Sequence, residues 1–438
     1  DEVTKEIRNA IDAVHGNASI PHRYGHAHGI YKDDVSNYAA GFIFGREWEP
    51  YTVLAYNKSG MTDGFNGKYL SISRSTPMEA WLTEMLDNVI SYEAERYKTT
   101  RPAAFMNWPT LDPLFHESEA TFREETEFRR KTGESVGVVD YSHAFDDDAV
   151  AIDETRIRIS QNFKSGIFAS YHVYPYFPDF LRNDESYGKV APVKGAGYYY
   201  NYLRDLKSRY SGIPLLISEF GVPTSRGIAR YQPDGMHHGG HNEDEQGEIL
   251  QRLFTSIKEA GAAGGIAFAL ADEWFKSNWM VKGMEEDGRL WYNAQDPEES
   301  YGIIAMSPVG GEKLKGKPEA WDKATLLYRD DRKSPLNVLN DNFDGARNLK
   351  GVYADYDAGY LYLRIDTDGK PDWSRVAYLI AIDTVGDKEG DHLIPFNIGI
   401  ESEVGFEFVV VLHGEKSSIL IDDKYNRMEF DKSLLRLP

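Results

Sequence analysis

The chain has 438 residues and no cysteine, and its 49 Lys and Arg against 70 Asp and Glu give a formal net charge of −21. The lack of cysteine excludes disulfide bonds, thiolate metal sites and cysteine nucleophiles. A strongly acidic surface repels nucleic acid and anionic lipid, and no apolar run reaches the roughly 18 residues of a membrane span. An uncharged ligand such as a sugar meets no such repulsion.

Residues 1–330 alternate short apolar runs with amphipathic segments. Six runs lack the period-two alternation of a half-exposed strand, which predicts strands buried on both faces. They are AIDAVHG (10–16), GFIFG (41–45), RPAAFMNW (101–108), GIFASYHVY (166–174), IPLLISEFG (213–221) and GGIAFAL (264–270).

Helices are predicted between these runs. Thr76-Pro77-Met78-Glu79 has the pattern of a capping box with proline at the first helical position. Apolar residues recur at helical spacing in three segments: Met78, Leu82, Met85 and Val89; Tyr199, Tyr202, Leu203, Leu206 and Tyr210; and Leu250, Leu253, Phe254 and Ile257. Alternating strands and helices predict an α/β fold with a parallel sheet covered by helices.

The pattern changes after about residue 335. The segment before it, residues 300–335, is charged and rich in Lys and Gly, as in GEKLKGKPEAWDK, and predicts a domain boundary. Beyond it, short runs rich in Tyr, Ile and Val are separated by Asp and Gly turns, which is typical of a small antiparallel β-sandwich. We therefore predict two domains, residues 1–330 and residues 335–438.

Polar and aromatic side chains directly follow the predicted strands. In an α/β barrel or a doubly wound sheet, the chemistry lies just past the carboxyl ends of the strands. The candidates at these ends are His15; Arg46, Glu47, Trp48 and Glu49; Asn107 and Trp108; Tyr171, His172 and Tyr174; Glu219; and Asp272, Glu273 and Trp274. We expect these carboxylates, imidazoles and aromatic rings to gather at one mouth.

A pair of carboxylates facing one sugar bond is what glycoside hydrolysis needs. One carboxyl group donates a proton to the leaving oxygen, and the other attacks the sugar or activates water. Trp and Tyr rings supply apolar area for stacking on sugar faces. Glu47 and Glu219 are the predicted pair, with Glu49 of the same GREWEP segment as the alternative to Glu47. Structural salt bridges are the other explanation for acidic residues at strand ends.

This set of strand-end residues resembles the large clan of retaining glycosidases built on the TIM (β/α)8 barrel. In that clan an Asn-Glu pair ends strand four, a His-x-Tyr motif ends strand six, a Glu ends strand seven and a Trp ends strand eight, and a His often ends strand three. The resemblance covers roughly residues 1–300. It implies that Glu47 is the acid/base and that Glu219 is the nucleophile. It also implies that His172 and Tyr174 are the His-x-Tyr pair and that His15 is the strand-three histidine.

Three features depart from the pattern of the clan. Arg46 stands where Asn usually precedes the acid/base, and Leu270 stands near the strand-eight Trp, whose role Trp274 would take from the loop. The six predicted strands match strands three to eight, and the first two strands are not visible. Because an open barrel exposes sheet edges, which proteins avoid, we expect a longer chain or a second polypeptide segment to complete the barrel.

Two groups of histidines lie on predicted loops. They are His22, His26 and His28 after the first predicted strand, and His237, His238 and His241 within GMHHGGHNEDEQG. Neither group has a standard zinc spacing. Substrate hydrogen bonding at the rim of the site, or plain loop structure, is the favoured role, and no metal or other cofactor is expected.

Acidic turns are weak candidates for calcium. One group is Asp146, Asp147 and Asp148, and the other is Asp383, Asp387 and Asp391. Neither has the spaced Gly and terminal Glu of an EF-hand loop, so solvated turn acids are the favoured explanation.

The C-terminal runs YLYLRIDTDG, LIAIDT and GFEFVVVL resemble carbohydrate-binding and DOMON-like sandwich modules. Their aromatic residues are candidates either for sugar stacking or for core and edge-strand positions. These residues are Tyr353, Tyr356, Tyr360 and Trp373.

The sequence thus favours a retaining glycosidase or transglycosidase that acts on a poly- or oligosaccharide, outside the cell or at its surface. The alternative is a non-catalytic carbohydrate-binding or cell-surface scaffold that keeps the barrel shape, because Arg46 and Leu270 depart from the clan. A metal-dependent hydrolase that uses the histidine groups is the third hypothesis.

Overall fold

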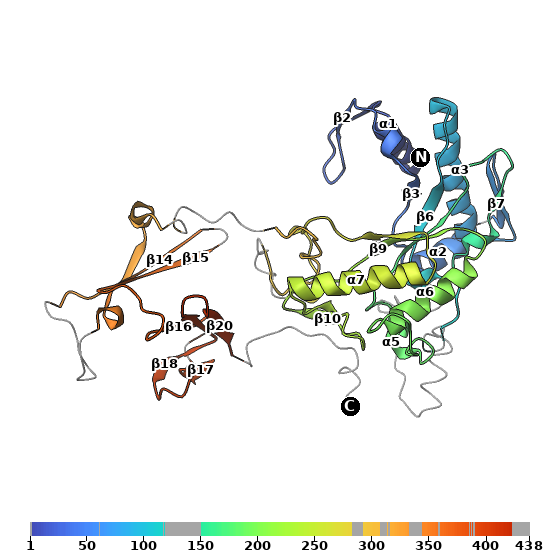
Figure 1. Ribbon diagram of the computed structural model, residues 1–438. Helices are drawn as coiled ribbons and strands as arrows, with labels where there is room; N and C mark the ends of the chain where they lie inside the picture. The colour runs from blue at the N-terminus through green and yellow to red at the C-terminus, as the bar shows by residue number, and fades with distance from the viewer. Residues whose placement is uncertain are drawn as a thin grey trace. The chain divides into compact units, whose positions relative to one another are not determined.

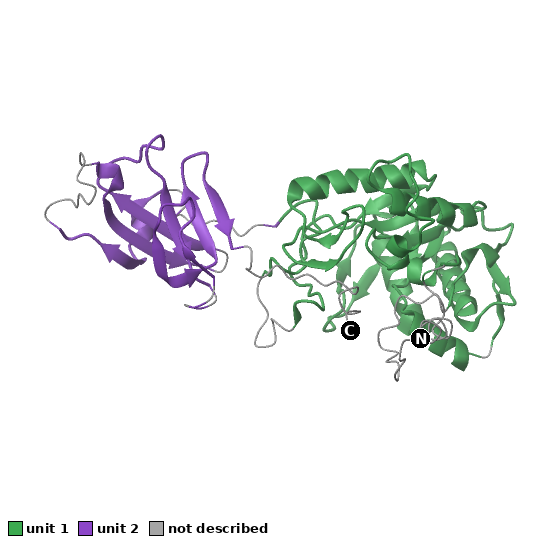
Figure 2. Cartoon of the chain, turned by 90° about the horizontal axis from the view of Figure 1, so that it is seen from below, with its two compact units in different colours: residues 1–305, 428–438 green, residues 306–427 purple. Residues whose placement is uncertain are grey.

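The computed structural model describes residues 2–60, 62–116, 118, 150–282, 292–306, 313, 316–332, 344–357, 360–384, 386, 388 and 390–422. The chain divides into two compact units, shown in Figure 2: residues 1–305 with 428–438, and residues 306–427. Each unit is described by itself below.

The first unit is built on a parallel sheet of five strands. Its order is β12-β9-β8-β6-β3, and every neighbouring pair is parallel. The strands are β3 (Phe42–Phe44), β6 (Ala103–Asn107), β8 (Ala169–His172), β9 (Leu215–Phe220) and β12 (Gly264–Ala267). Five of the six predicted strands are therefore confirmed, and the α/β class with them. The order in the sheet follows the order in the chain without a reversal.

The prediction of a strand over residues 10–16 is wrong. These residues belong largely to the helix α1 (Glu2–Val14). Ile7, Ile11 and Val14 recur at helical spacing, and this period begins upstream of the apolar run that suggested a strand. Ile11 is buried, and α1 packs against the helix α3 (Pro77–Tyr97).

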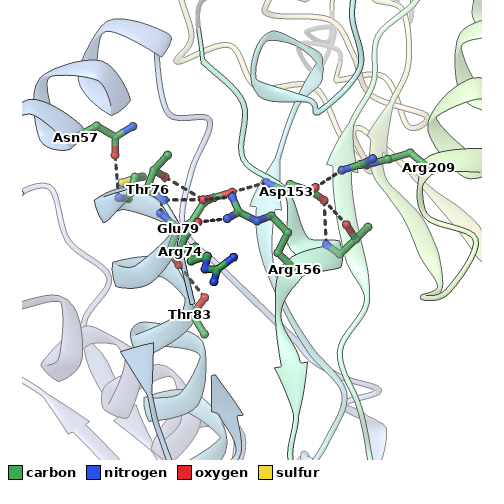
Figure 3. Close-up of polar contacts among 10 residues, drawn as sticks. Asn57, Arg74, Thr76, Glu79, Thr83, Asp153, Arg156 and Arg209 are labelled. Atoms are coloured by element: carbon green, nitrogen blue, oxygen red, sulfur yellow. Dashed lines mark hydrogen bonds and ion pairs between the residues drawn. The ribbon is translucent and has the colours of Figure 1, made fainter. Parts of the chain in front are cut away.

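The predicted capping box at the start of α3 is confirmed and belongs to a larger polar network. The Thr76 side chain accepts from the backbone N–H of Glu79, and the Glu79 carboxylate accepts from the backbone N–H of Thr76 at 2.8 Å. Figure 3 shows that the same carboxylate reaches Arg156 at 2.9 Å and the backbone N–H of Asp153 at 3.3 Å. Glu79 is 4% exposed, so this network joins α3 to the segment before β8 inside the protein.

Two further predicted helices cover the sheet near β9 and β12. They are α6 (Gly197–Arg209) and α7 (Glu243–Glu259), which lie side by side, with α7 against both strands (Figure 1). A second capping box, Asn242 with Glu245, starts α7. The core between helices and sheet contains the fully buried Tyr171, Tyr199 and Tyr202. None of the helices in the described part of the chain is both long and apolar enough to cross a bilayer.

Smaller elements complete the first unit. The hairpin β1 (Ala18–Ile20) with β2 (Gly29–Tyr31) follows α1. The short antiparallel pair β10 with β11 follows β9, and β5 pairs with β4 and β7 in another small sheet. The bounds are α2 (Pro50–Ser59), α5 (Phe180–Asn183), β4 (Gly64–Asn66), β5 (Leu70–Ser73), β7 (Arg158–Ile159), β10 (Ile228–Arg230) and β11 (His238–Gly239).

The described strands of the second unit are paired in three antiparallel sheets. Their bounds are β13 (Thr325–Arg329), β14 (Leu349–Tyr356) and β15 (Leu361–Thr367); β16 (Tyr378–Ile382), β19 (Phe408–Leu412) and β20 (Ser418–Ile421); and β17 (Asp391–Leu393) with β18 (Glu401–Phe406). A small core gathers Phe406, Val409 and Val411. Of the four aromatic candidates, Tyr353 and Tyr356 lie on β14, and Tyr356 is 80% exposed.

Candidate functional site

Three strand ends of the parallel sheet bring Glu47, His172 and Glu219 together. Glu47 follows β3 after a turn in which Gly45 takes a φ of +100°, a value that favours glycine. His172 is the last residue of β8, and Glu219 lies near the end of β9. Because parallel strands end at one edge of a sheet, residues far apart in the sequence meet there.

These residues open into a cavity of about 580 Å³. Its lining contains seven Phe, Tyr and Trp residues together with charged groups of both signs. It is formed by Ile43, Gly45, Arg46, Glu47, Met106, Trp108, Pro109, His172, Tyr174, Tyr176, Phe177, Glu219, Arg230, His238, Phe268, Lys276, Asn278, Trp279, Glu298 and Tyr301. A concave site with aromatic walls and converging polar groups is typical of a small-molecule binding site.

The imidazole of His172 lies between the two carboxylates. Its Nδ1 is 2.9 Å from Oε1 of Glu47 and 3.2 Å from Oε2 of Glu219. Tyr174 donates a hydrogen bond of 2.8 Å from its hydroxyl to the same Oε2 of Glu219. The Glu47 side chain is 41% exposed and that of Glu219 is 27% exposed, so both can meet a ligand in the cavity.

The surroundings of Glu219 act on its pKa in opposite directions. Burial raises the pKa of this carboxyl group, and the charge of Glu47 raises it further. His172 and the Tyr174 hydroxyl lower it, and the net effect is a pKa above the ordinary value. Burial also raises the pKa of Tyr174, so this hydroxyl stays protonated and remains a donor.

The same three residues are the candidate metal ligands among the residues that the structure describes. One ligand atom from each of Glu47, His172 and Glu219 lies within 4.8 Å of the others. Two carboxylate oxygens and one imidazole nitrogen form a donor set that zinc accepts. The His172 contacts to both carboxylates already account for their proximity without an ion.

Seven of the predicted site residues line the cavity: Arg46, Glu47, Trp108, His172, Tyr174, Glu219 and His238. Arg46 pairs with Glu49, the residue that was the alternative to Glu47. The Trp108 indole N–H donates to the backbone carbonyl of Trp48 at 2.9 Å, and its ring lies 5.6 Å from that of Phe177. Glu49 is the residue before α2 and is not part of the lining, so the geometry favours Glu47.

His15 follows a helix rather than a strand, so the strand-end argument for it is wrong. Its ring stacks on Tyr97 at 3.7 Å between centroids, and its Nε2 lies 3.1 Å from Oε1 of Glu93. It is 8% exposed, and burial lowers its pKa. In the described structure His15 joins α1 to α3 and is not part of the cavity lining.

Asn107 and Trp48 support the site from behind. The Asn107 amide donates to the Tyr171 hydroxyl at 2.8 Å and to Oε1 of Glu154 at 3.2 Å, and Asn107 is 1% exposed. The Trp48 ring packs edge-on against Trp81. Tyr171 is fully buried in the core near α6 and α7, whereas Trp48 packs against the core that contains residues of α3.

The residues predicted after β12 lie beside the cavity. Asp272 accepts a hydrogen bond from the backbone N–H of Gly302 at 2.9 Å, and Glu273 pairs with Lys276 at 2.7 Å. The Trp274 ring lies 5.1 Å from that of Tyr292. These three residues are absent from the described lining, whereas Lys276 is present.

Of the histidines in the two predicted groups, His238 lines the cavity in the described structure and the others do not. His238 lines the cavity, stacks on Tyr176 at 4.4 Å and lies 3.1 Å from a Glu298 oxygen. His237 and His241 stack on each other behind it, at 5.8 Å. In the first group, His28 is exposed on the hairpin after α1 and lies edge-on to His22.

The acidic calcium candidates do not form a described site. Asp146, Asp147, Asp148 and Asp387 lie outside the described residues. Asp383 accepts a hydrogen bond of 3.0 Å from the backbone N–H of Gly386, as in a tight turn, and Asp391 starts β17.

Sequence reasoning missed several lining residues. Phe268 comes directly after β12 and lines the cavity, whereas Leu270 is 72% exposed and Trp274 is not part of the described lining. Six more come from the segments after β9 and β12: Arg230, which ends β10, and Lys276, Asn278, Trp279, Glu298 and Tyr301. A strand-end search stops too early to find them, although Phe268 lies within the predicted run 264–270.

Comparison with known proteins gives no family assignment. No protein-family model matches the chain, and no curated protein matches it. Among the solved structures, one that matches is a beta-glucuronidase from Faecalibacterium prausnitzii, 15% identical, with a TM-score of 0.23. The match covers 52% of this chain and 33% of that one, so this chain spans about a third of its length.

Proposed function

We propose that the chain is a retaining glycosidase in which Glu219 is the nucleophile and Glu47 is the general acid/base. The observation that carries this proposal is the placement of one imidazole nitrogen, His172 Nδ1, within 3.2 Å of both carboxylates at the mouth of an aromatic cavity. Two carboxyl groups that share one cleft can act on the same bond, one as the proton donor and the other as the nucleophile.

The two carboxylates are close enough to act on one glycosidic bond, and retention of configuration is the stereochemistry that we propose. Oxygens of Glu47 and Glu219 approach within 4.8 Å. Retaining enzymes place their carboxyl groups about 5–5.5 Å apart, whereas inverting enzymes leave about 6.5–9.5 Å for a water molecule. We assign the site to the shorter class, and the anomeric configuration of the first product tests this assignment.

The proposed reaction has two steps. The Glu219 carboxylate attacks the anomeric carbon while the Glu47 carboxyl group protonates the leaving oxygen, so one C–O bond forms and another breaks. Glu47, now a carboxylate, then takes a proton from water, whose oxygen displaces Glu219 from the sugar. A sugar hydroxyl in place of that water would give transglycosylation. No cofactor is needed in either case.

The winding of the sheet supports a barrel-type architecture. A doubly wound sheet reverses its strand order at a switch point, whereas the five strands here follow one another in chain order. Within the described residues, β3 and β12 are the edges of the sheet, with Ile43 40% and Ile266 52% exposed. Because exposed edges invite pairing, we propose that further strands, from this protein or a partner polypeptide, close a (β/α)8 barrel.

The second unit fits the same function as a carbohydrate-binding β-sandwich. Its antiparallel sheets and the exposed Tyr356 support this role. A polysaccharide substrate would place the protein outside the cell or at its surface.

A non-catalytic carbohydrate-binding scaffold is the second candidate. The observation that favours it is the pair of sheet edges, β3 and β12, that lack a partner strand in the described residues. A scaffold would bind oligosaccharides without releasing a product.

The deciding experiment screens aryl glycosides and oligosaccharides with the wild type, Glu219→Gln and Glu47→Gln. We expect turnover to fall by about 10⁴-fold or more in Glu219→Gln, because the covalent step is lost. NMR of the first product should show the anomeric configuration of the substrate. Glu49→Gln is the matched control and should retain activity. Binding without any product would support the scaffold, and turnover that survives in Glu219→Gln would exclude the proposed nucleophile.

A further inference from the structure

One corner of the cavity differs from the rest in its charge. Three cationic residues line the cavity: Arg46, Arg230 and Lys276. Arg46 pairs with Glu49, and Lys276 lies 2.7 Å from a Glu273 oxygen, so each has a carboxylate of its own. The acidic lining residue Glu298 has an oxygen 3.1 Å from Nε2 of His238.

Arg230 shares its nearest carboxylate with a second arginine. Its nearest acid is Asp179, at 3.8 Å, and Asp179 also lies 3.6 Å from Arg182. One carboxylate therefore serves two guanidinium groups, which leaves an excess positive charge at this corner. Among the residues that the structure describes, Arg230 makes no hydrogen bond, although a guanidinium group carries five N–H donors.

Arg230 is held in place without using those donors. Its guanidinium carbon lies 4.1 Å from the centre of the Phe177 ring, and Phe177 in turn lies 5.6 Å from Trp108. The side chain is 22% exposed, and β10 fixes its backbone by pairing with β11. The corner thus joins an aromatic wall, which suits the apolar face of a sugar, to a preorganised cation.

We propose that the saccharide bound in this cavity carries an anionic substituent, and that Arg230 binds it. A carboxylate or sulfate group accepts two parallel N–H bonds from a guanidinium group, which a neutral hydroxymethyl group cannot do. The net charge of −21 makes such a ligand costly to attract over the surface as a whole, so a local cation is needed to select it. This inference rests on the proposed function, which makes the ligand a saccharide, and it adds that this saccharide is anionic.

The test measures binding of monosaccharide probes by NMR titration, which needs no turnover. The probes are D-glucuronate and D-galacturonate, their uncharged partners D-glucose and D-galactose, and galactose 6-sulfate. We expect the wild type to bind at least one charged probe about tenfold or more tightly than its neutral partner, and added salt to reduce this preference. A preference for a hexuronate identifies a carboxylate, and a preference for galactose 6-sulfate identifies a sulfate.

Variants assign the preference to Arg230. Arg230→Gln should reduce the affinity ratio of charged to neutral probe about tenfold. Arg230→Lys should retain part of it, because the charge stays while the paired N–H geometry is lost. Arg204→Gln is the control, since Arg204 is an exposed arginine on α6 that pairs with Asp205. Thermal unfolding of each variant checks that it is folded, and Arg230→Lys serves as the test if Arg230→Gln is not.

The outcomes separate this inference from the proposed function. Equal affinity for charged and neutral probes in the wild type, no measurable affinity for the charged probes, or an unchanged ratio in Arg230→Gln overturns the inference. Turnover of neutral glycosides that depends on Glu219 would then leave the proposed function intact. Binding of a charged probe through Arg230, without turnover of any glycoside, would support the inference and contradict the proposal that the chain is a glycosidase.

Discussion

The hydroxyl group of Tyr174 donates a hydrogen bond of 2.8 Å to Oε2 of Glu219. Burial raises the pKa of Glu219, and this hydrogen bond is one of three interactions that oppose the rise, beside the charges of His172 and Lys276. A nucleophilic carboxylate must be ionised, so the bond serves the proposed role directly. It also makes the role of Tyr174 measurable through pH.

Replacing Tyr174 with Phe should move the acidic limb of the activity profile to higher pH. Without the donor, the pKa of Glu219 rises further, and the ionised fraction is lost at a higher pH as the solution is acidified. A hydrogen bond to a charged group stabilises it by about 1.5–3 kcal/mol, which corresponds to a shift of about one pH unit or more. The measurement is kcat/KM against pH.

The matched control for this prediction is Tyr176→Phe. Tyr176 lines the same wall, but its hydroxyl contacts Tyr301 rather than Glu219. The acidic limb of kcat/KM for Tyr176→Phe should lie at the same pH as that of the wild type. An unshifted limb in Tyr174→Phe would remove Tyr174 from the control of Glu219.

Metal ions should inhibit this site rather than activate it. Zinc bound by Glu47, His172 and Glu219, whose ligand atoms lie within 4.8 Å, would occupy the oxygens that attack the sugar and donate the proton. We expect micromolar to millimolar zinc to lower turnover and a chelator to restore it. Dialysis of the untreated protein against a chelator should leave activity unchanged. Loss of activity on dialysis, restored by zinc, would instead support a metal-dependent hydrolase.

The parallel sheet and the centre of the site follow from local signals in the sequence. Runs such as IPLLISEFG are apolar without alternation because both faces of the sheet are covered, and residues placed directly after such runs, Glu47 and His172, meet at one edge. At residues 10–16 the apolar run suggested a strand, whereas the helical period through Ile7, Ile11 and Val14 indicated a helix, and the structure has the helix α1 there. Local patterns could not decide between the two, because short apolar runs suit either element.

The outer part of the site could not be predicted in the same way. Lys276 and Glu298 come from irregular segments after β12, and Arg230 ends the three-residue strand β10, which is too short to show a period in the sequence. Their placement depends on tertiary contacts, such as the stacking of Arg230 on Phe177. The residues proposed to select a ligand are therefore less visible in the sequence than those proposed to react with it.

The two capping boxes offer a matched test of the buried network in Figure 3. Glu79 caps α3 and also contacts Arg156 and Asp153 inside the protein, whereas Glu245 caps α7 in an exposed position. Loss of an exposed cap costs about 1 kcal/mol, and removal of one partner from a buried ion pair costs about 3–5 kcal/mol. We expect Glu79→Ala to destabilise the protein by about 3 kcal/mol, which is the low end of the range for a buried ion pair. The low end applies because the Arg156 side chain is 37% exposed and can be hydrated when Glu79 is removed.

Denaturant unfolding of both variants, followed by circular dichroism, measures this difference. Glu245→Ala should lower the free energy of unfolding by about 1 kcal/mol. Equal losses in the two variants would show that the contacts of Glu79 beyond the cap do not stabilise the fold.

Glu154 should make the protein less stable as the pH rises. It is 2% exposed, and burial raises its pKa from 4.5 to about 8, although it accepts hydrogen bonds from Tyr210 and Asn107. Between these two values the folded protein holds a proton that the unfolded chain has released, so stability falls as the pH rises from about 4.5 to about 8. The loss amounts to a few kcal/mol when the interval is complete.

Replacing Glu154 with Gln keeps the shape of the protonated side chain and cannot ionise. The variant should therefore match the wild type near pH 4.5 and exceed its thermal stability by several degrees at pH 8. Glu95→Gln on the exposed face of α3 is the control, and it should not alter the pH dependence, because the Glu95 side chain is 67% exposed. The measurement is the midpoint of thermal unfolding at intervals between pH 4.5 and 8.5. A variant that is destabilised equally at both ends of this range would show that Glu154 is held in its ionised form.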